Sequence, residues 1–399
     1  MQKPPIPKNE MERIISLADI DLDYSSHKES FKDLAKLAAK VAGTDISLVN
    51  LIDTFTQWTI SNHGLSIDQM PREDSVCQYT IVSDDHFEVD DLSADTRFND
   101  KFYVTDEPGL RYYYGVPLKT TDGYNLGALC VLDKQLKVLT PEKVELIKII
   151  ADEIVNRLNA FKAIDILKNK LAEANETKKK VAHDIRGPLG GIIGLAQVIS
   201  EQGHENQIDE VLEFINLIHK SGRSILELAD EILSADKPQA PKGDEFNLLL
   251  FKDKLEQLYL PQAINKNISF AITVSDTSAK TPFSKNKLLQ ITGNLISNAM
   301  KFTPENGTVT VDLNLKVERG HKNHLRIKVT DTGVGLGKAA IDNILKGKAS
   351  STHGTGGEQG YGFGLALVKH LVDSLKGTMH IYSEAGQGAT FEVNLPQAG

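Results

Sequence analysis

The chain has 399 residues but only two cysteines, no long apolar run and no excess of positive charge. Cys77 and Cys130 are too few for a disulfide framework, which is typical of proteins in a reducing compartment. No run of about eighteen apolar residues is present, so we expect no membrane-spanning helix. The formal net charge of −9 argues against general binding to nucleic acid, because such binding needs a basic face.

The N-terminus also lacks the apolar segment of a signal peptide, and the sequence therefore predicts a soluble, cytoplasmic protein. Apolar residues make up 40% of the chain, which is enough for hydrophobic cores. The length indicates roughly two to four domains rather than one.

After an N-terminal arm over residues 1–24, the chain has the pattern of a sheet with helices. One amphipathic helix is predicted from an apolar face made of Phe31, Leu34, Leu37, Ala38 and Val41. Strands are predicted at residues 45–53, 57–61, 87–91, 112–119 and 126–133. Short turns between the first two and between the last two predict hairpins. A further helix is predicted to begin at Pro141 and to continue into the middle of the chain.

Four segments of residues 25–160 resemble a GAF domain. They are SLVNLID at residues 47–53, PREDSVC at 71–77, PGLRYYYG at 108–115 and LGALCVLD at 126–133. The resemblance implies an antiparallel sheet with helices, and many domains of this family hold a small molecule over the sheet. It therefore leaves room for a ligand of unknown identity in this domain.

Cys77 and Cys130 have different surroundings in these segments. Cys77 is open to interpretation as a chromophore attachment or a redox sensor, but a small residue packed at a helix start is the simpler reading. Cys130 lies in an apolar strand and is expected in the core. The tyrosines at residues 112–114 either line a pocket or cover the sheet.

The middle of the chain is organised around residues 181–189, VAHDIRGPL. The apolar residues before it recur in threes and fours, with Lys178 at the remaining seam position: Ile164, Leu167, Leu171, Ala174 and Val181. This spacing predicts a helix that packs on another helix, with His183 off the packed seam. A second helix of the same pattern is predicted over residues 208–232, after a turn at 202–206. Two such helices form an antiparallel hairpin, and pairing of two hairpins into a four-helix bundle predicts a homodimer.

A proline-punctuated linker, KPQAPKG at residues 237–243, separates this hairpin segment (161–236) from a mixed α/β unit at 244–399. The first motif of that unit is NLISNAMKF at 294–302. Asn294, Asn298 and Lys301 share one helix face. Amide oxygens are suited to Mg²⁺, a lysine to phosphate, and the ring of Phe302 to a base. Alone, the motif is equally consistent with a surface helix carrying incidental amides.

Two further motifs are rich in glycine. In VTDTGVG, residues 329–335, a strand runs into a turn where Asp331 can accept a hydrogen bond from an adenine amino group. Gly333 and Gly335 would let the backbone approach the base. In GYGFGLAL, glycines open a predicted helix whose free N–H groups make a phosphate cradle; its candidate binding residues are Gly360, Gly362, Gly364 and Leu365. The spacing is neither that of a Walker loop nor that of a dinucleotide-binding fold.

In this order and spacing, the three motifs resemble the N box and the two glycine boxes of the GHKL ATPases. GQGATF at 386–391 resembles that family's terminal strand motif, with Thr390 as a candidate binding residue, and the glycine-rich residues 337–359 resemble a lid over ATP. Together with the His183 motif, the chain is similar to a sensor histidine kinase of a two-component system. The expected fold class is multidomain α+β, with a GAF-like antiparallel sheet, a helical hairpin forming a dimeric four-helix bundle, and a C-terminal α/β sandwich of GHKL type.

The resemblance implies ATP-dependent autophosphorylation of His183 on Nε2. Asp184 would accept the proton or hold the ring tautomer, and Arg186 would offset phosphate charge or form a surface ion pair. Mg²⁺ would bind at Asn298. Lys301 and the glycine-box amides would complete the phosphate cradle, and Asp331, with Thr390 beside it, would select adenine through a shared water.

Two positions depart from related enzymes. Gly187 stands where relatives with phosphatase activity carry Thr or Asn, so strong phosphatase activity is not expected. Asn294 stands where related ATPases carry a glutamate base, so rapid free ATP hydrolysis is not expected either. No receiver domain follows the ATP-binding unit, and a response regulator receiver domain in trans is the expected partner. The competing interpretations are a catalytically silent ligand-sensing scaffold, an ATP-driven clamp and a serine kinase of the same ATP-binding fold.

Overall fold

The structure is a computed structural model of the chain. It describes residues 5–24, 28–202, 246–275, 278–281, 283, 287–317, 323–346, 354–355 and 362–397, together with 212, 215–219, 222–223 and 226. The chain divides into two compact units. One contains residues 1–164 and 246–397, and the other contains residues 165–245. Within the first unit we call residues 5–164 the N-terminal module and residues 246–397 the C-terminal module.

The N-terminal module is built on a six-stranded sheet in the order β3-β2-β1-β6-β5-β4, in which all neighbours are antiparallel. The strands are β1 (Ile46–Ile52), β2 (Thr56–His63), β3 (Gln69–Pro71), β4 (Phe87–Val89), β5 (Tyr112–Lys119) and β6 (Asn125–Asp133). Both predicted hairpins, β1–β2 and β5–β6, are confirmed. The short strand β3 was not predicted.

Every residue of β1 is buried because helices and turns cover both faces of this sheet. One face packs against α1 (Glu10–Ala18), α2 (Lys32–Ala42) and the first turns of α5 (Pro141–Gln202). The other face packs against the short helices α3 (Cys77–Thr80) and α4 (Phe102–Thr105). Single 3₁₀ turns lie at Lys28–Phe31 and Arg72–Asp74.

Three details of this module differ from or refine the prediction. The segment predicted as an N-terminal arm contains the helix α1, whose Ile14 and Leu17 are buried in the core. Leu37, predicted on the apolar face of α2, is exposed; the buried face carries alanines instead. Cys130 is buried, which confirms its predicted place in the core, and Tyr112, Tyr113 and Tyr114 are buried in the neighbouring strand.

Helix α5 begins at Pro141, as predicted, and continues for 62 residues to Gln202. The motif at residues 181–189 is therefore helical, and the helix passes through Pro188 without ending. The turn after Gln202, most of the second helix of the hairpin and the linker at 237–243 lie outside the described residues. Among the described residues, no helix combines the length and the apolar character that crossing a membrane requires.

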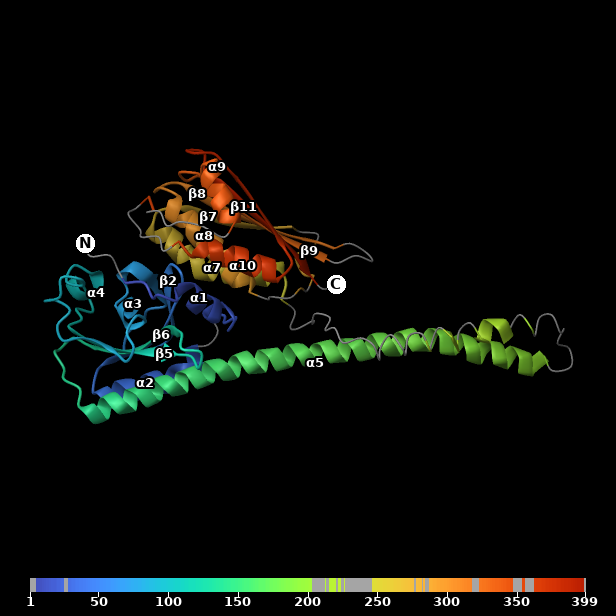
Figure 1. The fold of residues 1–399 in the computed structure, drawn as a ribbon, viewed down its shortest axis with the longest axis horizontal. Coiled ribbons are helices and arrows are strands. Elements are labelled where there is room, and N and C mark those ends of the chain that lie inside the picture. Colours follow the sequence, from blue (N-terminus) through green and yellow to red (C-terminus); the bar gives the residue numbers. More distant parts are fainter. Residues whose placement is uncertain are drawn as a thin grey trace. The chain divides into compact units, whose positions relative to one another are not determined.

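The C-terminal module is a five-stranded sheet in the order β10-β11-β9-β8-β7, with only β7 and β8 parallel. The strands are β7 (Ser269–Val274), β8 (Thr308–Lys316), β9 (Asn323–Asp331), β10 (Thr378–Ser383) and β11 (Ala389–Gln397). Burial alternates along β8, β9 and β11, so one face of the sheet meets the core. Helices α7 (Leu248–Asn265), α8 (Leu288–Phe302) and α10 (Gly364–Ser374) cover that face (Figure 1), and α9 (Lys338–Leu345) follows the turn after β9.

The two modules of this unit touch through side chains of the first module that pack on α7 and α8. Trp58 stacks on Tyr24 at 5.1 Å between ring centroids, and the edge of Trp58 meets Tyr259 of α7 at 5.9 Å. Gln69 Nε2 donates to the carbonyl oxygen of Leu258, also in α7, at 2.9 Å. Lys287, at the start of α8, forms an ion pair of 2.5 Å with Asp19.

Candidate functional site

The predicted face of the first nucleotide motif is formed on α8, and its residues are buried rather than at the surface. Asn294, Asn298 and Lys301 are each less than a tenth exposed. Asn294 Nδ2 donates to the carbonyl oxygen of Gln290 at 2.9 Å, and Asn298 Nδ2 donates to that of Asn294 at 2.9 Å. Because each amide nitrogen is held by the turn before it, each amide oxygen is directed away from the helix backbone.

The oxygen of Asn294 is the group that best fits a metal ion. Asn294 Oδ1 is buried and has no hydrogen-bond partner among the residues that the structure describes. A buried polar atom without a partner costs about 1–3 kcal/mol, so such an atom calls for an explanation. A hard amide oxygen is a type of ligand that Mg²⁺ accepts. No group of three or more His, Cys, Asp or Glu suited to a metal occurs in the described part of the chain.

The second motif forms the predicted strand-to-glycine turn at the end of β9. Asp331 Oδ1 accepts hydrogen bonds from the N–H of Gly333 at 2.8 Å and of Ala389 at 3.2 Å. Gly333 is required by space, because a Cβ there would lie 2.3 Å from the carbonyl oxygen of Phe302. Gly335 has φ of +66°, a conformation that favours glycine. The turn is therefore packed against the end of α8, which brings the first and second motifs together.

Burial raises the pKa of Asp331 above its ordinary value, although the two N–H groups that it accepts from oppose this effect. The carboxyl group is only 6% exposed and forms no ion pair among the described residues. A carboxyl group in such a place can accept a hydrogen bond from a neutral donor, as an adenine amino group would be.

Thr390 does not lie beside Asp331, which corrects the prediction. Thr390 pairs with Thr330 across the β9–β11 ladder, and their hydroxyl oxygens are 3.0 Å apart. Successive side chains of a strand point to opposite faces, so Thr390 and Thr330 lie on the face opposite to the Asp331 side chain. The position directly opposite Asp331 is Ala389.

The third motif opens α10, as predicted, and meets the first. Gly364 is the first residue of the helix, and a Cβ on it would lie 3.1 Å from Asn294 Oδ1. Gly362 has φ of +80°, and Leu365 packs against the core of the module. Gly360 lies outside the described residues. The structure thus brings the start of α10, the inner face of α8 and the Asp331 turn together.

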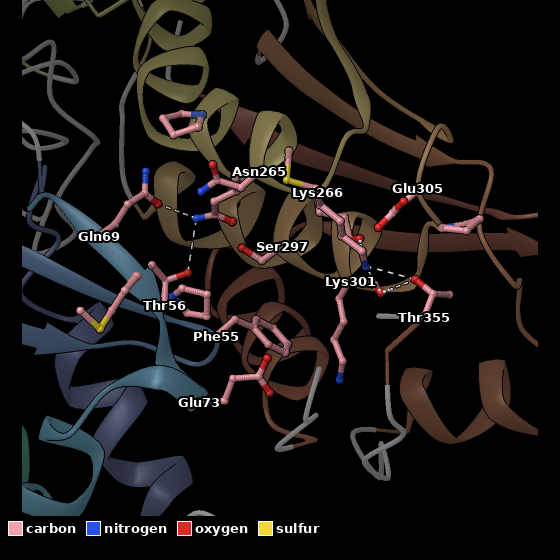
Figure 2. Close-up of a pocket in the computed structure, with 16 residues that line it drawn as sticks. Phe55, Thr56, Gln69, Glu73, Asn265, Lys266, Ser297, Lys301, Glu305 and Thr355 are labelled. Carbon is pink, nitrogen blue, oxygen red and sulfur yellow. Dashed lines mark hydrogen bonds between the residues drawn. The ribbon is translucent and has the colours of Figure 1, made fainter. Parts of the chain in front are cut away.

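Lys301 lies at the edge of this arrangement, beside two aromatic rings. Its Nζ is 4.8 Å from the ring centroid of Phe302 and 5.7 Å from that of Phe55, which belongs to the N-terminal module. Figure 2 shows Phe55 and Lys301 among the residues that line a cavity of about 550 Å³. On one wall, Gln262 of α7 donates hydrogen bonds to Gln69 and Thr56 of the N-terminal module.

Three residues near the site were not predicted. Lys266 Nζ donates to the carbonyl oxygens of Met300 and Lys301, where α8 leaves its last carbonyl groups without helical partners. Thr355, in the predicted lid, donates to the carbonyl oxygens of Lys301 and Thr303. A lysine near the end of a helix often binds the last carbonyl groups of its own helix. Lys266 instead binds those of another helix, 34 residues further along the chain. Phe55 carries no sequence signal, because nothing in a hairpin loop indicates which distant module it touches.

His183, Asp184 and Arg186 lie in α5, within the second compact unit. Their backbone is helical, and their side chains lie outside the described part of the structure. The nucleotide motifs belong to the first unit, so the acceptor histidine and the candidate ATP site are in separate units.

Comparison with protein families matches two ranges of the chain. Residues 178–241 match the family described as "His Kinase A (phospho-acceptor) domain". Residues 284–399 match the family described as "Histidine kinase-, DNA gyrase B-, and HSP90-like ATPase". The first range contains His183, and the second contains all of the nucleotide motifs.

Individual relatives cover parts of the chain. It is 31% identical over 258 residues to the autoinducer 2 sensor kinase/phosphatase LuxQ of Vibrio vulnificus. The aligned region covers 61% of this chain and 29% of LuxQ. It is 39% identical over 135 residues to a cyclic di-GMP phosphodiesterase of Pseudomonas aeruginosa, covering 34% of this chain and 23% of that enzyme. The solved catalytic domain of the histidine kinase ThkA aligns with 38% of this chain and 93% of its own, at 20% identity and a TM-score of 0.30. The chain thus carries a histidine phospho-acceptor domain and a histidine kinase-type ATPase domain, the two domains of two-component sensor histidine kinases.

Proposed function

We propose that the chain is an ATP-dependent protein histidine kinase that phosphorylates its own His183. The observation that carries this proposal is the meeting of the three nucleotide motifs at α8, in a chain whose central helix carries the histidine. On α8 the oxygen of Asn294 has no hydrogen-bond partner among the described residues. Phosphoryl transfer depends mainly on positioning and on stabilising charge, and these are the properties that the motifs supply.

Each part of the site has a role in this proposal. Lys301 contributes a positive charge to the phosphates, and the N–H groups at the start of α10 hold their oxygens. Asp331 accepts a hydrogen bond from the adenine amino group and selects adenine. Asn298 and Asn294 present the oxygens that would hold Mg²⁺, which when bound neutralises charge on the phosphates. Thr390 has no role at the nucleotide.

At the acceptor, a neutral imidazole is a good nucleophile near pH 7. Asp184, the next residue, accepts the proton of His183 or fixes its tautomer so that Nε2 attacks the phosphorus. Arg186 offsets the charge of the phosphoryl group. Gly187 offers no side chain to position a water molecule, so removal of the phosphoryl group from a partner is slow.

The phosphoryl group passes to an aspartate of a separate receiver domain, and the helical hairpin pairs with a second copy to form a four-helix bundle. The N-terminal module acts as a GAF-like sensor. Its six-stranded antiparallel sheet, covered by helices on both faces, supports this assignment, while the ligand that it senses is unknown.

The test is incorporation of radiolabel from γ-labelled ATP with Mg²⁺ into the native chain and into His183→Gln. We expect label that is labile in acid, stable in alkali and absent from the variant. Label that survives acid, or that persists without His183, would move the acceptor to another residue. ATP binding without any label under all conditions tested would favour a silent scaffold.

A further inference from the structure

The chain's two cysteines meet in the core of the N-terminal module. Cys77 Sγ and Cys130 Sγ are 3.8 Å apart, although the residues are 53 positions apart in sequence. Both side chains are buried, at 3% and 1% exposure. Cys77 is the first residue of the short helix α3, and Cys130 lies in β6, a strand with a partner on each side.

Hydrogen-bond donors converge on these two sulfur atoms. Asn50 Nδ2 lies 3.2 Å from Cys77 Sγ and 3.5 Å from Cys130 Sγ. The amide of Asn50 is held in this orientation because its Oδ1 accepts a hydrogen bond of 2.8 Å from Thr59 Oγ1. The hydroxyl of Tyr113 donates to Cys77 Sγ at 3.3 Å. An apolar packing role for Cys77 would not require any of these polar contacts.

The two thiols therefore have unequal chemistry. Burial raises the pKa of Cys77, but hydrogen bonds from Cys130, Tyr113 and Asn50 outweigh burial and leave the pKa below its ordinary value. Burial and the neighbouring Cys77 raise the pKa of Cys130 well above its ordinary value. The thiolate is the reactive form of cysteine, so Cys77 is the better suited of the two to act as the nucleophile.

We propose that Cys77 and Cys130 are a redox-active pair that a hydroperoxide converts into a reversible disulfide within one chain. In the first step the Cys77 thiolate attacks the terminal peroxide oxygen and the O–O bond breaks. The leaving hydroxide or alkoxide takes a proton, and Cys77 becomes a sulfenic acid. In the second step the sulfur of Cys130 attacks that of Cys77, the S–O bond breaks, and the hydroxyl group leaves as water with the Cys130 thiol proton. Two thiols lose two electrons, and the peroxide gains them.

Closing the bond requires the sulfur atoms to approach from 3.8 Å to about 2.05 Å. Cys130 is held in the sheet opposite Leu48 of β1 and Gly115 of β5. Cys77 lies in a four-residue helix beside the sheet, and this element is the one expected to move. Because only two cysteines are present, any disulfide within the chain must join these two. This inference does not depend on the kinase activity.

The experiment uses the reduced full-length chain and hydrogen peroxide. After peroxide treatment and acid quenching, the protein is unfolded, alkylated with iodoacetamide and weighed intact. We expect loss of both alkylations with a mass about 2 Da below that of the reduced, unalkylated chain, reversed fully by dithiothreitol. Full alkylation of both cysteines after peroxide, or a disulfide that joins two chains on a non-reducing gel, would overturn the proposal.

Two variants assign the roles of the cysteines. In Cys130→Ser, the sulfenic acid of Cys77 has no partner, and dimedone should trap it at residue 77. In Cys77→Ser, Cys130 should stay reduced and alkylate fully after the same treatment. Dimedone labelling of Cys130 instead would reverse the roles. Tyr113→Phe keeps the ring but removes the donor, and it should slow formation of the disulfide several-fold; near-UV circular dichroism checks that each variant folds.

Discussion

The ring of Phe55 lies directly against Gly364, the first residue of α10. A Cβ placed on Gly364 would be 2.8 Å from Cε2 of Phe55. The same ring is 5.7 Å from the ammonium group of Lys301. A side chain of the N-terminal module is therefore in contact with two of the groups that the proposed function assigns to ATP phosphates.

Phe55→Ala is expected to strengthen ATP binding. If the ring competes with the phosphates for the space beside Gly364 and Lys301, ATP binds only those molecules in which the ring has moved away. The apparent dissociation constant is then the intrinsic one divided by the fraction of such molecules. We expect removal of the ring to lower the ATP dissociation constant by about fivefold or more. Isothermal titration with Mg-ATP would measure this change.

The matched control for this prediction is Phe102→Ala, which removes a half-exposed phenylalanine from α4 of the same module. It should leave the dissociation constant unchanged. An unchanged or larger dissociation constant in Phe55→Ala would mean that the ring does not compete with the nucleotide.

Asn294→Ala is expected to separate binding from stability. The Asn294 oxygen has no partner among the described residues, so its removal relieves a cost, and alanine has the higher helix propensity. These two gains offset the loss of the hydrogen bond that Asn294 Nδ2 donates to the carbonyl oxygen of Gln290. We therefore expect an unchanged or higher melting temperature together with a loss of Mg-ATP affinity of about tenfold or more. Thermal unfolding and nucleotide titration, each with and without Mg²⁺, would measure the two effects.

Gln290→Ala provides the contrast within the same helix. Gln290 is equally buried, but its Nε2 donates to the hydroxyl of Tyr24 at 3.0 Å. Loss of that satisfied hydrogen bond should lower stability by about 1 kcal/mol. If both variants are destabilised to the same extent, the Asn294 oxygen has a structural partner and the metal assignment fails.

Local sequence patterns predicted a helix or strand well where the residues of that element alone decide its conformation. The bounds of β5 match the prediction residue for residue, because its run of aromatic and apolar residues is followed closely by the turn that contains Gly123. The strand-to-turn position of Asp331 followed from the glycines in the same way. The helix α1 was missed because Glu10 and Arg13 suggest a solvated segment, whereas both are buried in an ion pair with each other.

Features that depend on distant pairing could not be predicted. The position of Thr390 relative to Asp331 is set by the register of β11 on β9, and an error of one residue moves a side chain to the other face. Phe55 meets Gly364 across more than 300 positions of sequence, and no local pattern carries that information.

Asp331→Asn is expected to weaken ATP binding and to remove its pH dependence. Burial raises the pKa of Asp331 above its ordinary 3.8, so in the wild type ATP affinity should fall as the pH decreases through that raised value and the acceptor becomes protonated. The variant cannot titrate and should show a flat profile, with an affinity at pH 7 lower by about tenfold. Titrations from pH 8 down to the lowest pH at which the protein stays folded would record both profiles.

The stability of this variant serves as its control. A carboxyl group whose folded-state pKa is raised contributes stability below its unfolded pKa, and that contribution is lost as the pH rises through the folded pKa. Replacing it with a neutral amide should therefore not destabilise the fold at pH 7. Asp312→Asn makes the same charge change at a half-exposed site on β8 and should leave ATP binding unaltered. Equal loss of affinity in both variants would show a general charge effect.

Glu10→Gln is expected to destabilise the N-terminal module. Glu10 is 1% exposed and pairs with Arg13 at 2.8 Å and Arg72 at 2.6 Å, so the variant leaves two buried guanidinium groups with a neutral partner. Breaking a buried pair in this way costs about 3–5 kcal/mol.

Burial raises the pKa of Glu10, but the two arginines outweigh it, and the pKa lies below its ordinary 4.5. The ion pairs therefore stabilise the fold above about pH 4.5, and this contribution is lost as the pH falls through the folded-state pKa. Urea unfolding of wild type and variant from pH 7 downward should show the largest difference at pH 7, with the two converging in acid. Glu29→Gln removes an exposed ion pair with Lys32 and should change nothing measurable; a Glu10→Gln variant as stable as Glu29→Gln would show that this buried cluster does not stabilise the module.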